Sequence, residues 1–303
     1  MARKNGSAGA NDNGGACDIF LHIPKTGGQT FHNLITREYR QESVLDTHCG
    51  LLTTQVWDQF IVKRKGEQPR YRAVIGHMKF GLHEILPGPA RYATFLRDPV
   101  KRFISYYLML RRMGVVPRDH RFDLKRPDWN SSCHETLGRE LDNGQTRALA
   151  NADWDLPFGE CSEEHLKRAR ANLDRYFGFV GLTERFDLSW MALKRVYGFR
   201  WHFYVPKNIN PQPDHSLSPE IVEAISGINR FDRQLYAHAQ ERLEETVRRY
   251  GVALRFELGA FVACNAVHQC LHHCRSWKKK LRQALKTERV TSEDLTSLRA
   301  VRR

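Results

Sequence analysis

The sequence lacks the features that mark secreted and membrane-embedded proteins. It contains no run of about 18 consecutive apolar residues, so we expect no membrane-spanning helix and no integral membrane association. Residues 1–16 are mainly Gly, Asn, Ala and charged residues without an apolar middle, which excludes a secretory signal and favours a disordered leader. The seven cysteines are odd in number and have no framework spacing, so reduced thiols are the simpler interpretation. These absences predict a cytoplasmic protein.

Negative charge is also scarce relative to positive charge. The chain has 48 Lys and Arg against 34 Asp and Glu, which gives a formal net charge of +14. Such a surplus favours anionic partners: nucleotides, nucleic acids, acidic glycans or membrane surfaces. Charge alone does not choose among these, and a basic enzyme with a scattered surplus is the alternative. The length and the apolar fraction of 41% are those of one large globular domain, with or without an appended segment.

Strand-like and helix-like segments alternate along the chain. Short apolar runs bounded by turn residues predict buried strands at residues 17–22, 71–76, 91–96 and 176–182. Helical patterns are predicted at residues 30–39, 51–65, 99–112, 134–141, 163–173, 186–197, 219–250 and 258–285. This alternation predicts an α/β fold with a central, mainly parallel sheet flanked by helices. We expect three parts: the leader 1–16, a domain at 17–257, and a helical, basic C-terminal extension at 258–303.

The segment after the first predicted strand has the composition of an anion-binding turn. It reads HIPKTGGQT at residues 22–30. Glycines let backbone N–H groups approach an anion, and a helix starting near Gly28 directs its positive end to the same place. Lys25 adds a full charge. An ATP-type loop would need a glycine where Pro24 stands, so that match is poor. The segment predicts a site for a tetrahedral anion, with a strand–turn–helix that binds nothing as the alternative.

A second motif follows the third predicted strand. It reads YATFLRDPVKRFISYY at residues 92–107. Arg97 stands at the carboxyl end of the strand, where α/β sheets bind ligands, and Ser105 lies between one and two turns into the next helix. A guanidinium and a hydroxyl there suit a phosphate, with further positive field from Lys101 and Arg102. The alternative for Arg97 is an ion pair with a nearby carboxylate.

Together the two motifs resemble the paired signatures of PAPS-dependent sulfotransferases, where PAPS is 3′-phosphoadenosine 5′-phosphosulfate. The likeness is strongest to the heparan sulfate 2-O- and 6-O-sulfotransferase type and its bacterial relatives. Their first motif, HIPKTGG(S/T)(T/S), is matched by residues 22–30 except at Gln29. Their second, (F/M)LRDPVxRxxSxY, is followed by residues 95–107. Softer likeness appears at residues 76–77, 143–147 and 229–236, so the resemblance spans about 17–250.

The resemblance implies a three-layer sulfotransferase fold related to nucleotide kinases, with PAPS as the donor. It implies that the 5′-phosphosulfate is held by Lys25, Thr26, Gly27, Gly28, Gln29 and Thr30. It further implies that Arg97 and Ser105 hold the 3′-phosphate. Gln29 replaces the usual small hydroxyl residue, which affects a side-chain contact and leaves the backbone cradle in place. Lys207 lies in a Pro-rich loop of the kind that covers the nucleotide in relatives, and we expect it to contact the donor.

The implied reaction is an in-line displacement at sulfur with a nucleotide phosphate leaving. Lys25 is the candidate to stabilise the charge that develops on the leaving group. We find no carboxylate partner for Mg²⁺ and expect no metal requirement. His77 is the predicted general base and acceptor contact, because it closes the second strand and relatives place a catalytic histidine in this region. His83 is the second candidate, and a structural histidine is the alternative for either.

Other signals are weaker. Arg147 is a candidate contact for an anionic acceptor, with a surface ion pair as the equal alternative. The C-terminal segment is rich in metal-ligand residue types, at Cys264, His268, Cys270, His272, His273 and Cys274. Their spacing matches no zinc pattern, and we favour a helix with solvent-facing histidines. For the basic tail at 275–289 we favour a solvated amphipathic helix over contact with a membrane or nucleic acid.

The leading hypothesis is therefore a PAPS-dependent sulfotransferase that acts on a hydroxyl of a carbohydrate or other acceptor and has no nucleic acid partner. The missing membrane anchor distinguishes the chain from Golgi relatives and suggests a bacterial cytosolic enzyme. The alternatives are a P-loop-type nucleotide or metabolite kinase and a non-catalytic protein that binds an acidic glycan. The sequence specifies neither the acceptor nor the oligomeric state.

Overall fold

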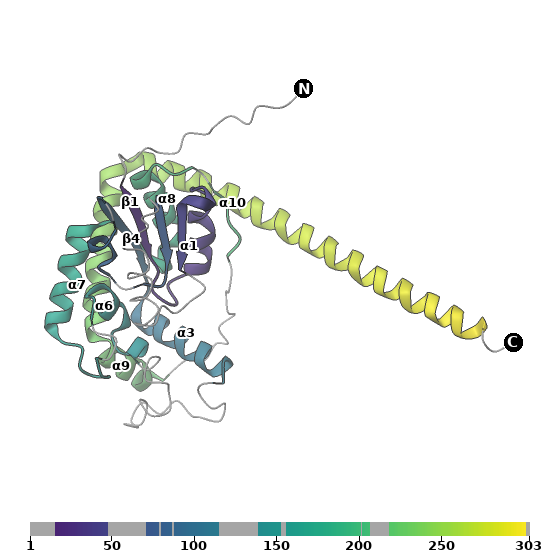
Figure 1. Ribbon diagram of the computed structural model, residues 1–303, viewed down its shortest axis with the longest axis horizontal. Helices are drawn as coiled ribbons and strands as arrows, with labels where there is room; N and C mark the ends of the chain where they lie inside the picture. The colour runs from purple at the N-terminus through teal and green to yellow at the C-terminus, as the bar shows by residue number, and fades with distance from the viewer. Residues whose placement is uncertain are drawn as a thin grey trace.

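The structure, a computed structural model, describes residues 16–47, 71–78, 80–86, 88–114, 139–152, 156–200, 202–206 and 218–300. Its centre is a five-stranded sheet in the order β2-β3-β1-β4-β5, with every neighbouring pair parallel (Figure 1). The strands are β1 (Cys17–Leu21), β2 (Val44–Thr47), β3 (Ala73–Gly76), β4 (Ala90–Leu96) and β5 (Phe177–Leu182). The predicted α/β fold with a parallel sheet is confirmed. The leader and the predicted helix at 51–65 lie outside the described residues.

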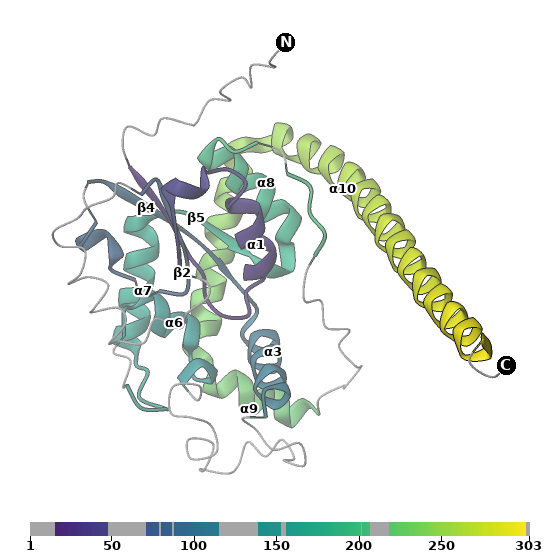
Figure 2. The ribbon, with the colours of Figure 1, turned by 45° about the vertical axis from the view of Figure 1, so that its right-hand side comes forward.

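Helices cover both faces of the sheet and make three layers. In sequence order they are α1 (Gly28–Ile35), α3 (Pro99–Arg112), α6 (Gly144–Leu149), α7 (Glu163–Tyr176), α8 (Phe186–Tyr197), α9 (Pro219–Ile228) and α10 (Arg230–Ala300). Helices α1 and α8 lie on one side of the sheet and α7 on the other (Figure 2). Short 3-10 helices, η1 (Gln41–Ser43), η2 (Leu82–Glu84), η3 (Arg139–Leu141) and η4 (Thr183–Arg185), occupy connections.

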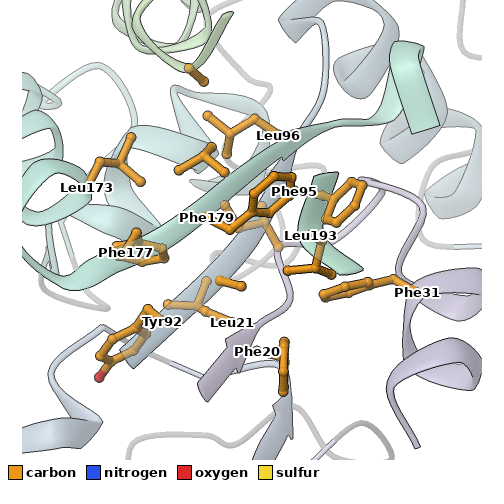
Figure 3. Close-up of a cluster of buried hydrophobic side chains, with 14 of the residues drawn as sticks. Phe20, Leu21, Phe31, Tyr92, Phe95, Leu96, Leu173, Phe177, Phe179 and Leu193 are labelled. Carbon is orange, nitrogen blue, oxygen red and sulfur yellow. The ribbon is translucent and has the colours of Figure 1, made fainter. Parts of the chain in front are cut away.

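The central strands form because they are buried on both faces. All five residues of β1 are buried, which is why it reads as a short apolar run. Phe20 of β1 meets Phe31 of α1 and Tyr197 of α8, with ring centroids 5.8 and 5.6 Å apart. Figure 3 shows Phe20, Phe31, Phe95 and Phe179 in this aromatic core. A core packed this densely fixes the strand ends, where the candidate site lies.

Two helix boundaries follow directly from local sequence. The Asp98 side chain accepts a hydrogen bond from the backbone N–H of Lys101 at 2.9 Å, and Pro99 is the first residue of α3. The helices predicted to fill 219–250 are α9 and the first part of α10. Helix α10 then breaks at Gly251, whose φ of 55° and ψ of −137° are not helical.

The second part of α10 projects away from the body of the protein (Figures 1 and 2). It crosses the predicted boundary at residue 257 without interruption, and the division into domain and extension stays a prediction. By length and composition, one helix in the described chain qualifies as a candidate membrane span, within Arg230–Lys279, with a mean hydropathy of 1.2. Buried core helices pass the same test, but only 17% of this window is buried. An uninterrupted apolar run would have predicted such a helix from the sequence, but this window is interrupted by polar residues.

Candidate active site

The carboxyl ends of the parallel strands meet at one edge of the sheet. Leu21, the last residue of β1, is level with Gly76 of β3 and with Thr94 of β4. The segments that leave this edge begin at His22, His77 and Arg97. Edges of this kind are where open α/β sheets bind ligands, because the loops there converge. The two sequence motifs and His77 are therefore brought together by the topology.

The turn after β1 is held by its own contacts. The buried hydroxyl of Thr26 donates to the carbonyl oxygen of Ile23 at 2.8 Å, so it braces the turn. Lys25 and Gly27 both have left-handed backbones, with φ of 71° and 81°. For lysine this conformation is strained, and such strain persists only where the surroundings impose it. The turn therefore presents the Lys25 side chain at a cost to the backbone.

Gly28, the first residue of α1, is required by a close approach. A Cβ at this position would lie 1.5 Å from Nε2 of His22, well inside any allowed contact. The motif predicts a glycine here for the close approach of an anion, and the His22 ring supplies an additional reason. Helix α1 still directs its first N–H groups, those of Gly28 and Gln29, toward this edge, while the N–H of Thr30 donates to the carbonyl oxygen of Gly27 at 3.1 Å.

Lys25 lies in a cluster of cations. Burial lowers the pKa of Lys25, and Arg112, Arg97 and Arg102 lower it further, in that order. Each of these arginines disfavours the charged form of the lysine because like charges repel. A negatively charged group placed among them would relieve this repulsion. The electrostatics of the edge thus favour an anion.

Arg97 and Lys25 are in direct contact. The Nη1 group of Arg97 donates to the carbonyl oxygen of Lys25 at 3.0 Å. Glu184 lies 3.8 Å from Nε of Arg97, so the carboxylate pairing considered as an alternative is present, though at a long distance. Burial lowers the pKa of Arg97, and Glu184 partly counters this. The two cationic residues predicted from separate motifs therefore lie close together at one edge of the sheet.

Ser105 and Arg102 lie three residues apart on α3 and so share a face of that helix. Ser105 is 9% exposed, and Arg102 is almost fully buried. Arg102 donates to the carbonyl oxygen of Pro24 at 3.1 Å and forms an ion pair with Glu140. The sequence analysis gave Arg102 only a general electrostatic role. Its contacts instead tie α3 to the turn that carries Lys25, and no local pattern in the sequence predicts this role.

His77 lies beside the turn. Its Nδ1 is 3.0 Å from the carbonyl oxygen of His22, and the two rings stack with centroids 4.4 Å apart. A carbonyl oxygen only accepts, so Nδ1 carries the proton, and Nε2 is then the accepting nitrogen of the neutral ring. This is the tautomer that a general base working through Nε2 needs.

His83 lies elsewhere. Its Nδ1 is 3.1 Å from the hydroxyl oxygen of Tyr92, and its ring lies 4.4 Å from that of Tyr176. Tyr92 is level with Ile19, in the middle of β1, so this contact holds His83 back from the carboxyl edge. Of the two histidines, the structure brings His77 and not His83 to the end of β1.

Arg147 is held inside the domain. It is 8% exposed, forms an ion pair with Asp142, and donates to the carbonyl oxygens of Leu156 and Pro157 at 2.8 and 2.7 Å. The ion-pair alternative therefore describes it, although the pair is buried and not at the surface. We leave Arg147 outside the proposed site because its donors are directed to these groups. Lys207 lies outside the described residues.

Gln145 of helix α6, which belongs to the weaker family likeness at residues 143–147, has a structural role at the site. The Gln145 side chain bonds both main-chain groups of Arg97, each at 2.9 Å. The buried carboxylate of Asp232 accepts from the backbone N–H groups of Gln145 and Thr146, at 3.2 and 2.7 Å. Burial raises the pKa of Asp232, partly offset by Arg102. A buried polar cluster in α6 and α10 thus fixes the end of β4.

Metal-ligand side chains do not gather in the part of the chain that the structure describes. No group of three or more His, Cys, Asp or Glu residues there is arranged to hold a metal ion. In the C-terminal segment, Cys264, Cys270 and Cys274 are exposed on α10.

Comparisons with known proteins agree with this chemistry. Over residues 13–290 the sequence matches the family model described as galactose-3-O-sulfotransferase. Human galactose-3-O-sulfotransferase 2 is 25% identical over 249 residues, covering 76% of this chain and 61% of that protein. Human heparan-sulfate 6-O-sulfotransferase 1 is 25% identical over 282 residues, covering 75% and 65%. A crystal structure of a mouse sulfotransferase complexed with PAP has 15% identity and a TM-score of 0.35, covering 71% of this chain and 64% of that one, too weak to carry an argument.

One prediction is overturned by these relatives. Both human proteins, and zebrafish heparan-sulfate 6-O-sulfotransferase 3-B, are vertebrate enzymes. The prediction of a cytoplasmic enzyme is therefore wrong, whereas a bacterial origin stays a prediction. It depended on the missing signal and anchor, but the chain spans only 61% to 65% of the length of these relatives. A segment missing from so partial a match carries no information about location.

Proposed function

Because this chain belongs to the galactose-3-O-sulfotransferase family, we propose that it transfers a sulfuryl group from PAPS to a hydroxyl of a carbohydrate. One observation carries the proposal: Arg97 donates to the carbonyl oxygen of Lys25, so cationic residues from the two motifs meet at one strand edge. A nucleotide with anions at both its 5′ and 3′ positions suits such a pair. The resemblance of both motifs to the PAPS-dependent enzymes supports the same donor.

The residues at the edge fit a doubly anionic nucleotide. Lys25 has a lowered pKa from burial and from three arginines, so a bound anion would relieve an existing repulsion. Lys25 and the backbone N–H groups of Gly27, Gly28 and Gln29 would hold the 5′-phosphosulfate, and Thr30, whose N–H donates to the carbonyl oxygen of Gly27 at 3.1 Å, would contribute through its side chain. Arg97 and Ser105 would hold the 3′-phosphate. The hydroxyl of Thr26 already donates within the turn, so Thr26 would contribute through its backbone.

PAPS supplies the sulfuryl group and, on transfer, departs as a nucleotide phosphate. The ammonium of Lys25 would stabilise the negative charge that develops on the departing oxygen, and the left-handed turn holds it in place for this. Nε2 of His77 would take the proton of the acceptor hydroxyl, because Nδ1 is committed to the carbonyl oxygen of His22. The adjacent main chain fixes the histidine ring, which keeps the accepting nitrogen oriented.

The acceptor is proposed to be a sugar hydroxyl. The family description and the first relative name galactose, and the second names heparan sulfate. We propose a galactose-terminated glycan as the first acceptor to test and a heparan-type chain as the second. The net charge of +14 suits an acidic glycan, although the charge is spread over the whole chain.

A transfer assay tests the proposal. Purified protein is incubated with PAPS carrying radioactive sulfur and with each acceptor in turn, and the label in the glycan is counted. We expect transfer to at least one sugar acceptor and loss of that transfer in Lys25→Ala. Phosphate transfer from ATP and Mg²⁺, with none from PAPS, would favour a kinase instead. Retention on heparin without transfer to either acceptor would favour a binding protein.

A further inference from the structure

Beyond Gly251, helix α10 attaches to the domain by one face only. Leu254 and Phe261 are fully buried, and Asn265 accepts a hydrogen bond from the backbone N–H of Tyr204 at 2.8 Å. Glu257 pairs with Arg195 of α8 at 2.7 Å. These attachments recur at spacings of three or four residues and so define the inner face of this part of α10. The opposite face points away from the domain.

That opposite face is apolar and uncovered. We call it the outer face and define it by Val252, Phe256, Ala263, Val267, Cys270, Cys274 and Trp277. The spacings between neighbours are three, four or seven residues, which places all of them within an arc of about 80° on a helix. Val252 and Phe256 are 80% and 78% exposed, and Val267 and Trp277 are 60% and 64% exposed. The outer face runs for about 38 Å along the helix.

The side of the helix opposite the outer face becomes strongly basic toward its end. His268, His272, Arg275, Lys279 and Arg282 follow one another at spacings of four and three residues, about half a turn from the outer face. Closer to the outer face, Arg255 and Lys278 each lie within about 40° of one of its edges, and these two residues form its basic border. Between Glu257 and Glu288 the sequence has no acidic residue. The helix is therefore amphipathic with a basic polar side.

The apolar outer face and its basic surroundings favour an anionic lipid surface as the partner over a second copy of this chain. Helices that pair with a copy of themselves carry both acidic and basic residues beside the apolar seam, which attract across it. Here a second copy would bring like charges together. A surface of anionic phospholipid instead complements both the apolar outer face and the basic border, and tryptophan and lysine favour the boundary between lipid and water.

We propose that the part of α10 from residue 252 to residue 279 is an interfacial helix that docks on an anionic phospholipid surface through its outer face. It lies along the surface and does not cross it, because a crossing helix would bury Arg255, Glu257 and the basic side in hydrocarbon. The domain is attached to the inner face and so stands on the water side of the docked helix. This docking is independent of the proposed transfer reaction.

Vesicle co-sedimentation of the full chain tests the docking. Phosphatidylcholine vesicles are compared with vesicles that also contain phosphatidylserine, at about 0.1 M and about 1 M salt, between which the Debye length falls from about 10 to about 3 Å. We expect binding to the anionic vesicles at least about tenfold tighter than to the neutral ones, weakened but not abolished by salt because the apolar contact remains.

Two matched variants identify the face. Val267→Asp/Trp277→Asp alters the outer face, and Gln269→Asp/Ser276→Asp makes the same change in charge on the other side of the helix. The first should lose at least about tenfold in affinity for anionic vesicles, and the second should stay within about threefold of the unaltered chain. Thermal unfolding of both, expected at the midpoint of the unaltered chain, verifies that the domain is intact.

Three outcomes would overturn the proposal. Equal losses in the two variants would mean that charge alone drives binding and that the outer face is not used. No preference for anionic over neutral vesicles would remove the lipid partner. A sedimentation mass of two chains that returns to one chain only in Val267→Asp/Trp277→Asp, with vesicle binding unchanged, would assign the outer face to a second copy.

Discussion

The side-chain amide of Gln145 spans both main-chain groups of Arg97. Its Oε1 accepts from the Arg97 N–H and its Nε2 donates to the Arg97 carbonyl oxygen, each at 2.9 Å. Asp232, which is fully buried, holds the backbone N–H of Gln145 in turn. Arg97, which is proposed to bind the 3′-phosphate, is thus positioned by the Gln145 side chain of α6 as well as by β4; we call this pair of hydrogen bonds the clamp.

Gln145→Ala should therefore weaken nucleotide binding, although Gln145 is not proposed to contact the nucleotide itself. Loss of two hydrogen bonds frees the main chain of Arg97, and we expect about a tenfold loss in affinity for 3′-phosphoadenosine 5′-phosphate. The affinity for a nucleotide lacking the 3′-phosphate should change much less. Calorimetry with both nucleotides measures this, and Gln269→Ala on the projecting helix is the control. Equal losses for the two nucleotides would contradict the clamp's connection to the 3′-phosphate.

Lys25→Met should slow transfer and stabilise the ligand-free protein. Removing the charge proposed to stabilise the departing oxygen should lower kcat by about 10²–10³-fold. The pKa of Lys25 is lowered in the folded state, so the unfolded chain binds this proton more tightly. The protonated lysine therefore costs the folded protein stability at neutral pH, and the cost disappears as the pH rises toward the ordinary value of 10.5.

Urea unfolding at a series of pH values checks the stability part of this prediction. Lys25→Met should be more stable than the unaltered chain at pH 7, and the two curves should converge as the pH approaches 10.5. Exposed Lys101→Met, which lies two residues into the neighbouring helix α3, is the control and should show no such difference. A Lys25→Met protein that is less stable at neutral pH would show that the charged lysine is stabilised by a neighbouring anionic group in the ligand-free fold.

The sequence predicted the centre of the fold better than its edge. Strands β1, β3, β4 and β5 were predicted because strands buried on both faces read as apolar runs. Strand β2 was missed because it is a short edge strand of sequence VLDT with a partly exposed pattern, which has neither a run nor a clean alternation. The helices predicted up to residue 250 end directly before Gly251, where α10 breaks, but the helix continues at once through residues 251–257, which were not predicted to be helical.

Some residues of the candidate site could likewise be predicted from the sequence and others could not. Lys25, Arg97 and His77 could be proposed from motifs and strand ends, because topology brings the ends of parallel strands together. The roles of Arg102 and Gln145 depend on partners 78 and 48 residues away, at Pro24 and Arg97, and no local pattern specifies such contacts. Arg147 was predicted to contact an anionic acceptor because of its residue type. In the structure its buried partners direct it into the domain, which the residue type could not predict.

His77→Ala should abolish turnover while leaving nucleotide binding intact. Removing the proposed base costs about 10²–10⁴-fold in kcat, since the acceptor hydroxyl must then lose its proton without a positioned partner. Affinity for 3′-phosphoadenosine 5′-phosphate should be unchanged within about twofold. His83→Ala is the matched control, because His83 contacts Tyr92 and lies away from the end of β1. Near-normal kcat in His77→Ala would remove the histidine from the reaction.

Gly28→Ala tests the close approach between the turn and the His22 ring. The added methyl would lie 1.5 Å from Nε2 of His22, and the forced shift should cost about 1–3 kcal/mol of the free energy of unfolding. In the His22→Ala background the ring is gone, so the same change should become neutral or stabilising by up to about 1 kcal/mol, the usual gain from replacing a helical glycine. Gly259→Ala, where a Cβ meets nothing within 4 Å, gives that gain alone. Urea unfolding of the four chains of the double-mutant cycle measures the coupling, and additive effects would mean that some other group, and not the His22 ring, requires glycine at this position.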